Sequence, residues 1–289
     1  MKRSLIFGAS GQDGRYLSQI CSERQIEAVT VARSNGCRYQ GTVADAALVD
    51  ELVQQEPDVI FHLAANSTTR HEALRENHET IVTGTLNILE SVLRYSPTTR
   101  VLIVGSGVQF KNSGLPISED CDFDPSSAYA VARIQSVYAA RYYRRLGVNA
   151  YVGYLFHHES PYRRPHHVSK MIIDGIKRIA AGAAEKITIG DASVEKEWAY
   201  AREVAEGMFM LVEQDDVYEA AIGTGVGHSI NDFLTEAFRQ AGLSLEEHVQ
   251  VRGDYRPEYA RLVSDPRTMT GLGWKATTDL EQLVELMLA

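Results

Sequence analysis

The chain has 289 residues, 44% of them hydrophobic and 23% charged, which is enough apolar sequence to bury a sizeable core. Its 38 Asp and Glu outnumber its 29 Lys and Arg, which argues against a protein that binds nucleic acid through an overall basic surface. No apolar run approaches the roughly 20 residues of a membrane span, and the N-terminus lacks a signal-peptide pattern, so we expect a cytoplasmic protein with no membrane partner. The three cysteines lack metal-ligand spacing, so we expect neither a disulfide framework nor a metal site.

The first half of the chain alternates short apolar runs with stretches of helical periodicity. The expected strands are residues 3–7, 28–32, 58–63, 101–104 and 148–155, and the expected helices are a stretch ending near residue 24 and residues 48–55, 80–95 and 127–146. The run at 58–63 is almost continuously apolar, as in a strand that is covered on both faces. This alternation predicts an α/β fold with a doubly wound parallel sheet.

The second half is less regular. We expect helices at residues 166–182, 201–213 and 229–241, the last capped by Ser229, and a short strand at 186–189. No Pro-, Gly- or Ser-rich linker separates the halves. The chain therefore divides into a first domain over residues 1–155 and a smaller, closely packed lobe over residues 156–289.

A glycine-rich loop follows the first expected strand. Gly8, Gly11 and Gly14 recur at three-residue spacing directly before a helix. Such glycines form a tight turn, let backbone N–H groups approach a pyrophosphate and let the helix pack close to the strand. The helix N-terminus adds partial positive charge for the phosphates. The loop therefore predicts that the first domain binds a dinucleotide.

The end of the second expected strand bears on which dinucleotide binds. An acidic residue there would bond the free ribose 2′-hydroxyl of NAD, whereas an arginine accommodates the 2′-phosphate of NADP. The segment 31–34 (Val-Ala-Arg-Ser) has no carboxylate, and the planar guanidinium of arginine matches phosphate geometry. We therefore expect NADP(H) rather than NAD(H), bound by Arg33 and Ser34; the alternative is a solvated surface arginine.

The loop spacing resembles that of the short-chain dehydrogenase/reductase superfamily. The string Gly-Ala-Ser-Gly-Gln-Asp-Gly (residues 8–14) resembles the GDP-mannose 4,6-dehydratase and GDP-4-keto-6-deoxymannose reductase branch of its extended class. This resemblance extends to Leu-Gly-Trp at 272–274 and implies a Rossmann fold with a C-terminal substrate-binding lobe. It also implies cofactor contacts by Ser10, Gln12, Asp13, Thr42, Leu63, Ala64, Ala65, Arg133, His158 and Arg163. At position 42 the family has an aspartate that faces adenine.

The resemblance also implies a reaction centre of a serine or threonine and a Tyr-x-x-x-Lys pair. Ser106 follows the strand at 101–104, and Tyr129 and Arg133 lie on one face of the expected helix at four-residue spacing. A cation there can lower the phenol pKa from about 10, so that Tyr129 exchanges a proton with a substrate oxygen near neutral pH. Arg133 replaces the lysine, and the alternative reading is a core tyrosine followed by a surface arginine.

One position separates two reactions. In the dehydratases a glutamate two residues after the serine or threonine is the acid/base for the C5 proton and the C6 hydroxyl, whereas this chain has Val108. Valine cannot move a proton, but hydride transfer at C4 needs only cofactor, Tyr129 and Ser106. We therefore expect an NADP(H)-dependent C4 reductase of a GDP-4-keto-6-deoxyhexose. The alternatives are a GDP-mannose 4,6-dehydratase with another acid/base, a nucleotide-sugar epimerase and a dinucleotide-binding protein that has lost catalysis.

The second half carries the residues that the resemblance assigns to the substrate. The segment 157–164 (His-His-Glu-Ser-Pro-Tyr-Arg-Arg) resembles the family string Asn-His-Glu-Ser-Pro-Arg-Arg, and 256–258 resembles its Arg-Pro-x-Glu motif. The implied substrate contacts are His157, Val168, Lys170, Lys196, Arg256 and Glu258. The family commonly dimerises through helices of the dinucleotide domain, so we expect a homodimer; the apolar face of residues 134–146 suits either a dimer interface or the core.

Overall fold

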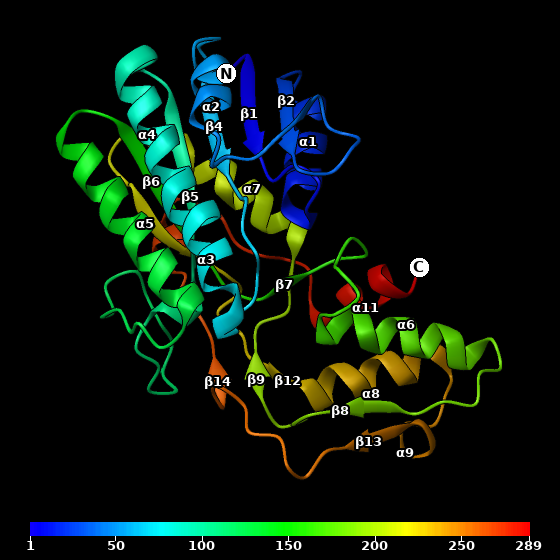
Figure 1. Cartoon of the computed structure of the whole chain (residues 1–289). Coiled ribbons are helices and arrows are strands. Elements are labelled where there is room, and N and C mark those ends of the chain that lie inside the picture. Colours follow the sequence, from blue (N-terminus) through cyan, green and yellow to red (C-terminus); the bar gives the residue numbers. More distant parts are fainter.

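A seven-stranded sheet, parallel throughout, forms the centre of the computed structural model, which describes all 289 residues (Figure 1). Its strand order is β11-β6-β5-β4-β1-β2-β3. The strands are β1 (Arg3–Phe7), β2 (Glu27–Ala32), β3 (Tyr39–Gln40), β4 (Val59–His62), β5 (Arg100–Ser106), β6 (Asn149–Leu155) and β11 (Glu219–Ile222). The order changes direction between β1 and β4, where the carboxyl ends of the strands open a crevice for ligands. The predicted doubly wound sheet is confirmed.

Helices cover both faces of this sheet. The helices of the whole chain are α1 (Gln12–Glu23), α2 (Ala46–Val53), α3 (Leu74–Asn77), α4 (Gly84–Tyr95), α5 (Ala128–Arg145), α6 (Val168–Ala180), α7 (Ala201–Val212), α8 (Ile230–Ala241), α9 (Leu245–His248), α10 (Arg267–Gly271) and α11 (Leu280–Leu288). One core of 26 buried residues joins the sheet to α2, α4 and α5, and another of 25 joins it to α1 and α7. The two cores are nearly equal in number of residues because the central strands are apolar on both faces. None of the helices combines the length and apolar character that a bilayer crossing requires.

The segment before α4 is helical further toward the N-terminus than its apolar pattern predicts. A 3₁₀ turn η1 (His71–Ala73), α3 and a π-helical segment η2 (His78–Thr83) run directly into α4. Residues 71–79 are mostly polar and exposed, so they carry no hydrophobic period to indicate a helix. A further 3₁₀ turn, η3 (Gly107–Gln109), follows β5.

A third core of 16 buried residues holds the smaller lobe together, between α6, α8, α11 and β8 (lower right in Figure 1). Three small sheets, β10-β7, β12-β9-β14 and β13-β8, complete it. Their strands are β7 (His158–Glu159), β8 (Ile187–Ile189), β9 (Glu195–Lys196), β10 (Ala199–Tyr200), β12 (His228–Ser229), β13 (Val249–Val251) and β14 (Arg261–Leu262). Ser229 caps α8 as predicted, through its hydroxyl and the N–H of Asp232.

The chain does not stay in the smaller lobe after residue 155. It returns to the first domain for α7 and β11, and β11 adds the last strand of the sheet beside β6. This return follows from burial, since the second sheet face needs α7 to cover it. Part of the range 156–289 therefore completes the dinucleotide domain rather than the lobe.

The edge strand β11 is held by a carboxylate. Glu219 accepts hydrogen bonds from Arg141 Nε at 2.9 Å and from the Tyr154 hydroxyl at 2.6 Å, and it also pairs with Arg144. Burial opposes its ionisation, but Arg141, Tyr154 and Arg144 together lower the pKa of Glu219 to about 2. The network ties α5 to the last strand of the sheet.

We expect Glu219→Gln to reduce the free energy of unfolding at neutral pH by about 3 kcal/mol, the value of a fall in pKa from about 4.5 to about 2. Because the folded-state pKa lies below that of the unfolded chain, this stabilisation is present above the ordinary carboxyl range and is lost as the pH falls toward 2. Urea unfolding of both proteins across this range measures it. Glu213→Gln breaks an exposed pair with Arg24 and should cost less than about 1 kcal/mol; equal losses in the two variants would contradict the prediction.

Candidate active site

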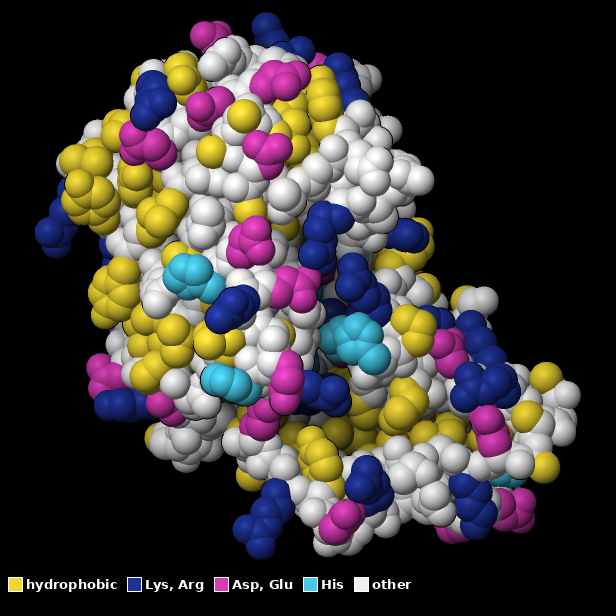
Figure 2. All heavy atoms as spheres, viewed as in Figure 1, with side chains coloured by type: hydrophobic (Ala, Val, Ile, Leu, Met, Phe, Trp, Pro, Cys, Tyr) yellow, Lys and Arg dark blue, Asp and Glu magenta, His cyan; other side chains and the backbone are white.

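A cavity of about 480 Å³ opens at the carboxyl ends of β1, β2 and β4. Figure 2 shows the surface hollowed between the sheet domain and the smaller lobe, with Lys, Arg and His side chains along the rim. The cavity brings together most of the predicted cofactor residues: Gly8, Ser10, Gly11, Gln12, Asp13, Gly14, Arg33, Ser34, Thr42, Leu63, Ala64, Ala65 and Arg163. It is closed from the other side by the segment 162–167, in which Arg164, His166 and His167 had not been predicted as site residues.

The glycine loop leaves no room for side chains. A Cβ on Gly14 would lie 2.5 Å from Ala9 Cα, and one on Gly8 would lie 2.8 Å from Ala64 N. Gly8 also has φ +87°, a conformation that favours glycine. The N-cap of α1 is Gly11, so no side chain accepts from the first N–H groups of the helix. These free donors and bare backbone fit the diphosphate of a dinucleotide.

Arg33, directly after β2, forms an ion pair with the Glu76 carboxylate of α3. Arg33 Nη1 donates to Glu76 Oε1 at 2.9 Å, and Asn66 Nδ2 donates to Glu76 Oε2 at 2.8 Å. These bonds lower the pKa of Glu76, so it is ionised at neutral pH. Sequence reasoning missed Glu76 because it lies 43 residues beyond Arg33, in α3.

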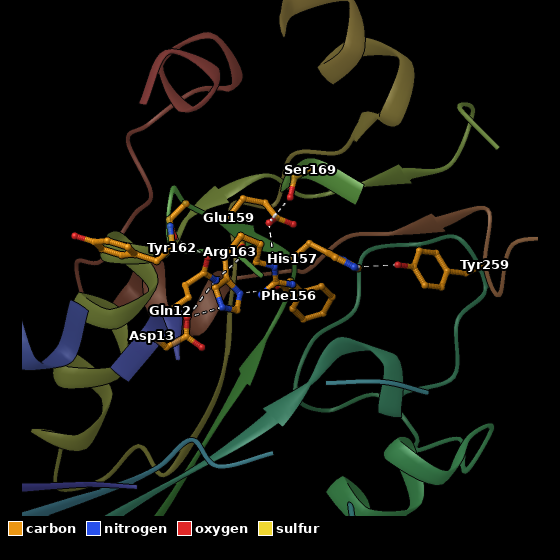
Figure 3. A network of polar contacts seen from close by, with 11 residues as sticks. Gln12, Asp13, Phe156, His157, Glu159, Tyr162, Arg163, Ser169 and Tyr259 are labelled. Atoms are coloured by element: carbon orange, nitrogen blue, oxygen red, sulfur yellow. Dashed lines mark hydrogen bonds and ion pairs between the residues drawn. The ribbon is translucent and has the colours of Figure 1, made fainter. Parts of the chain in front are cut away.

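A polar network joins the glycine loop to the chain after β6 (Figure 3). His158 Nε2 lies 2.9 Å from Asp13 Oδ1, and its Nδ1 donates to the Phe156 carbonyl at 2.7 Å. Burial disfavours both charges, but the pair lowers the pKa of Asp13 and raises that of His158. The Ser160 hydroxyl donates to Gln12 Oε1 at 2.7 Å and so holds the first residue of α1 as well. His158 therefore supports the loop from behind rather than lining the cavity.

Buried charges continue from this network into the lobe. Glu159 accepts from Ser169 Oγ at 2.6 Å and pairs with Arg163 Nε at 3.1 Å. Lys196 is 5% exposed, with its Nζ 4.5 Å from the Trp198 ring centroid. Burial lowers the pKa of Lys196 to about 8, although Glu159 opposes this shift. A buried cation of this kind is suited to an anionic ligand group.

The proposed reaction centre lies where β5 ends and α5 begins. Ser106 is the last residue of β5, and Tyr129 lies in the first turn of α5. Arg133 is 2% exposed and donates from Nη1 to the Val104 carbonyl at 2.5 Å, with its Cζ 5.0 Å from the Tyr129 ring centroid. A buried guanidinium must satisfy its donors within the protein. Arg133 thus contacts the backbone and the tyrosine ring and does not line the first cavity, and its contact with the cofactor stays a prediction.

A second cavity of about 780 Å³ lies on the lobe side of this centre. Val108 lines it together with five titratable side chains, those of His71, Asp124, Glu258, Tyr259 and Arg261. The Asp124 N–H donates to the Gln109 carbonyl at 2.8 Å, which places Asp124 beside the residue that follows Val108. No spacing or motif in the sequence indicates this proximity.

The other predicted substrate residues line neither of these two cavities, although His157 contacts Tyr259 at the wall of the second. His157 Nε2 is 3.1 Å from the Tyr259 hydroxyl (Figure 3), and Lys170 is paired with Asp174 at 2.5 Å. Val168 begins α6, and Arg256 is exposed. No group of three or more His, Cys, Asp and Glu side chains converges as metal ligands would.

Comparisons of sequence agree on one family. A family model described as GDP-mannose 4,6 dehydratase matches residues 5–287. GDP-mannose 4,6 dehydratase 1 of Arabidopsis thaliana is 28% identical over 99% of this chain and 88% of that protein. The GDP-mannose 4,6-dehydratase of Vibrio cholerae serotype O1 is 26% identical over 100% of this chain and 93% of that protein.

Solved structures share the fold. RMD from Pseudomonas aeruginosa, complexed with NADPH, has a TM-score of 0.87 at 20% identity, covering 100% of this chain and 98% of that chain. UDP-glucose 4-epimerase from Thermus thermophilus, in complex with NAD, has a TM-score of 0.85 at 20% identity, covering 99% of this chain and 97% of that chain. Both likenesses extend over the sheet and the smaller lobe.

Proposed function

Because the chain belongs to the GDP-mannose 4,6-dehydratase family of short-chain dehydrogenase/reductases, we propose that it is an NADP(H)-dependent enzyme that removes water from GDP-mannose. The observation that carries the proposal is the presence of two cavities with complementary chemistry. One has the bare glycine cradle of a dinucleotide site. The other holds a carboxylate, Asp124, beside Val108.

The residues of the reaction centre and the second cavity supply the proton transfers that this reaction needs. A bound nicotinamide ring would accept a hydride from C4 of the sugar and return it to C6. Tyr129 takes the proton of the C4 hydroxyl, while the Ser106 hydroxyl holds the same oxygen. Asp124 removes the C5 proton and delivers it to the departing C6 hydroxyl, which leaves as water. The Tyr129 hydroxyl then gives its proton to C5, so the cofactor and the enzyme return to their starting states.

A C4 reductase is the second candidate, and Val108 is the observation that favours it. Reduction of an existing 4-ketone needs one hydride and the Tyr129 proton, and no acid/base at position 108. A single assay separates the two reactions: purified protein is given GDP-mannose with NADP, or GDP-4-keto-6-deoxymannose with NADPH, and the products are identified by mass spectrometry.

We expect GDP-mannose to lose one water with no net change in the cofactor. If GDP-mannose is untouched and NADPH is consumed with the keto sugar, the reductase is correct and the dehydratase proposal fails. Isomerisation without loss of mass would identify an epimerase. Absence of turnover with GDP-, UDP- and dTDP-sugars would identify a protein that has lost catalysis. UDP- and dTDP-sugars at matched concentration test whether the protein requires guanine as the nucleotide base.

We further propose that two copies pair through the outer face of α5. Tyr138 and Tyr142 are each 58% exposed there, whereas Val137 on the same helix is buried in the core. Aromatic side chains of this kind are enriched in interfaces. We expect light scattering to give the mass of a dimer, and Tyr142→Glu to give that of a monomer; a wild-type monomer at micromolar concentration would contradict this.

A further inference from the structure

An ion pair borders the cofactor cavity at the end of β2. Arg33 and Asn66 both line this cavity, and each donates a hydrogen bond to one oxygen of Glu76. The two bonds hold the carboxylate at the cavity rim, between the β2 end and the segment after β4. The Arg33 and Glu76 side chains are 63% and 40% exposed, so the pair can exchange for a ligand without disturbing the core.

At this rim the protein would discriminate between NAD and NADP. The two dinucleotides differ only at the ribose 2′ position, which carries a hydroxyl in one and a doubly charged phosphate in the other. A carboxylate accepts a hydrogen bond from the hydroxyl and repels the phosphate, whereas an arginine binds the phosphate. The usual rule searches for the acidic residue at the end of the second strand. Here the arginine occupies that place, and the carboxylate reaches the same corner from α3.

We propose that Glu76 determines how strongly this protein prefers NADP(H) over NAD(H), by competing with the 2′-phosphate for Arg33. NAD(H) binds with the Arg33–Glu76 pair intact. NADP(H) must displace the carboxylate from the guanidinium and then lie close to its negative charge. A prediction from Arg33 without Glu76 therefore gives too strong a preference for NADP(H). The inference rests on the dinucleotide binding proposed above and is independent of the sugar chemistry.

Calorimetric titration with NADPH and with NADH tests this without turnover. Glu76→Gln should tighten NADPH binding about three- to tenfold, since it removes one exposed ion pair and one nearby like charge. NADH binding should not tighten. Arg33→Ala should weaken NADPH binding about tenfold, the value of one lost charge-assisted contact of about 1.4 kcal/mol.

Two controls make the result specific. Glu79→Gln removes a charge from an exposed side chain about one helical turn from Glu76, and it should change neither affinity. In the Arg33→Ala background, Glu76→Gln should lose most of its effect on NADPH, because the competition has been removed. Glu76→Ala should give the same order of affinities as Glu76→Gln, and matched thermal unfolding confirms that the variants fold.

Whether Glu76→Gln strengthens or weakens NADPH binding decides the proposal. If Glu76→Gln weakens NADPH binding, Glu76 positions Arg33 for the phosphate instead of competing with it, and the proposal is overturned. It is equally overturned if the two affinities do not change. If the wild-type protein binds neither dinucleotide, the failure lies in the proposed function, because the variants have no binding to alter.

Discussion

Tyr129→Phe is expected to lower turnover about 10²- to 10⁴-fold, the usual contribution of a positioned acid or base, while dinucleotide affinity is unchanged. Phenylalanine retains the ring that lies 5.0 Å from the Arg133 guanidinium carbon, so the packing at the start of α5 is preserved. It removes only the hydroxyl that would exchange a proton with the C4 oxygen. Initial rates of product formation measure the first effect, and calorimetry measures the second.

The matched control for this variant is Tyr138→Phe. Tyr138 lies on the same helix but is 58% exposed, so loss of its hydroxyl should leave the rate unchanged. A Tyr129→Phe protein that turns over at the wild-type rate would show that another group moves the C4 proton. Loss of dinucleotide binding in the same variant would instead point to a structural role for the hydroxyl.

Asp124→Asn is expected to stop loss of water, also by about 10²- to 10⁴-fold, while oxidation at C4 continues. The amide keeps the size of the side chain but cannot accept the C5 proton. In single turnover, the variant should therefore form reduced cofactor that remains reduced, because the hydride acceptor at C6 is never made. Absorbance of the reduced nicotinamide and mass spectrometry of the sugar measure the two steps separately.

Asp122→Asn is the control for this second variant. Asp122 is exposed and paired with Lys111 at 3.0 Å, only two residues from Asp124, and its replacement should not affect the rate. Val108→Glu in the Asp124→Asn background places a carboxylate on the same cavity and should recover part of the activity. A wild-type rate of water loss in Asp124→Asn would exclude Asp124 as the acid/base and direct the search to His71 or Glu258 in the same cavity.

The parts of the fold that were predictable depend on neighbouring residues. The alternating apolar runs predicted the parallel sheet, and the glycine spacing predicted the cradle between Gly8 and Gly14 in which side chains do not fit. Ser229 was predicted as a cap because its hydroxyl needs only the N–H of Asp232. Each of these signals is contained within a few residues, because the interaction behind it is local.

The parts that were not predictable depend on residues far apart in the chain. The range 156–289 gives no sign that α7 and β11 return to cover and extend the sheet. Residues 71–79, before α4, are mostly polar and exposed, so they lack the hydrophobic period that would have indicated a helix. The hydrogen bond from the buried Arg133 guanidinium to the Val104 carbonyl likewise joins residues 29 positions apart.

The amino-acid sequence alone was sufficient for the fold class and the glycine loop, because these follow from periodicity and short spacings. Ser106, Tyr129 and Arg133 were suggested by the family resemblance, and their roles stay predictions. The three-dimensional arrangement was needed to place Glu76 beside Arg33 and Asp124 beside Val108. Charges on different elements come together only after the sheet and its helices have packed, and at physiological salt their interaction is screened beyond about 8 Å. The Arg33–Glu76 contact was therefore decided by tertiary packing.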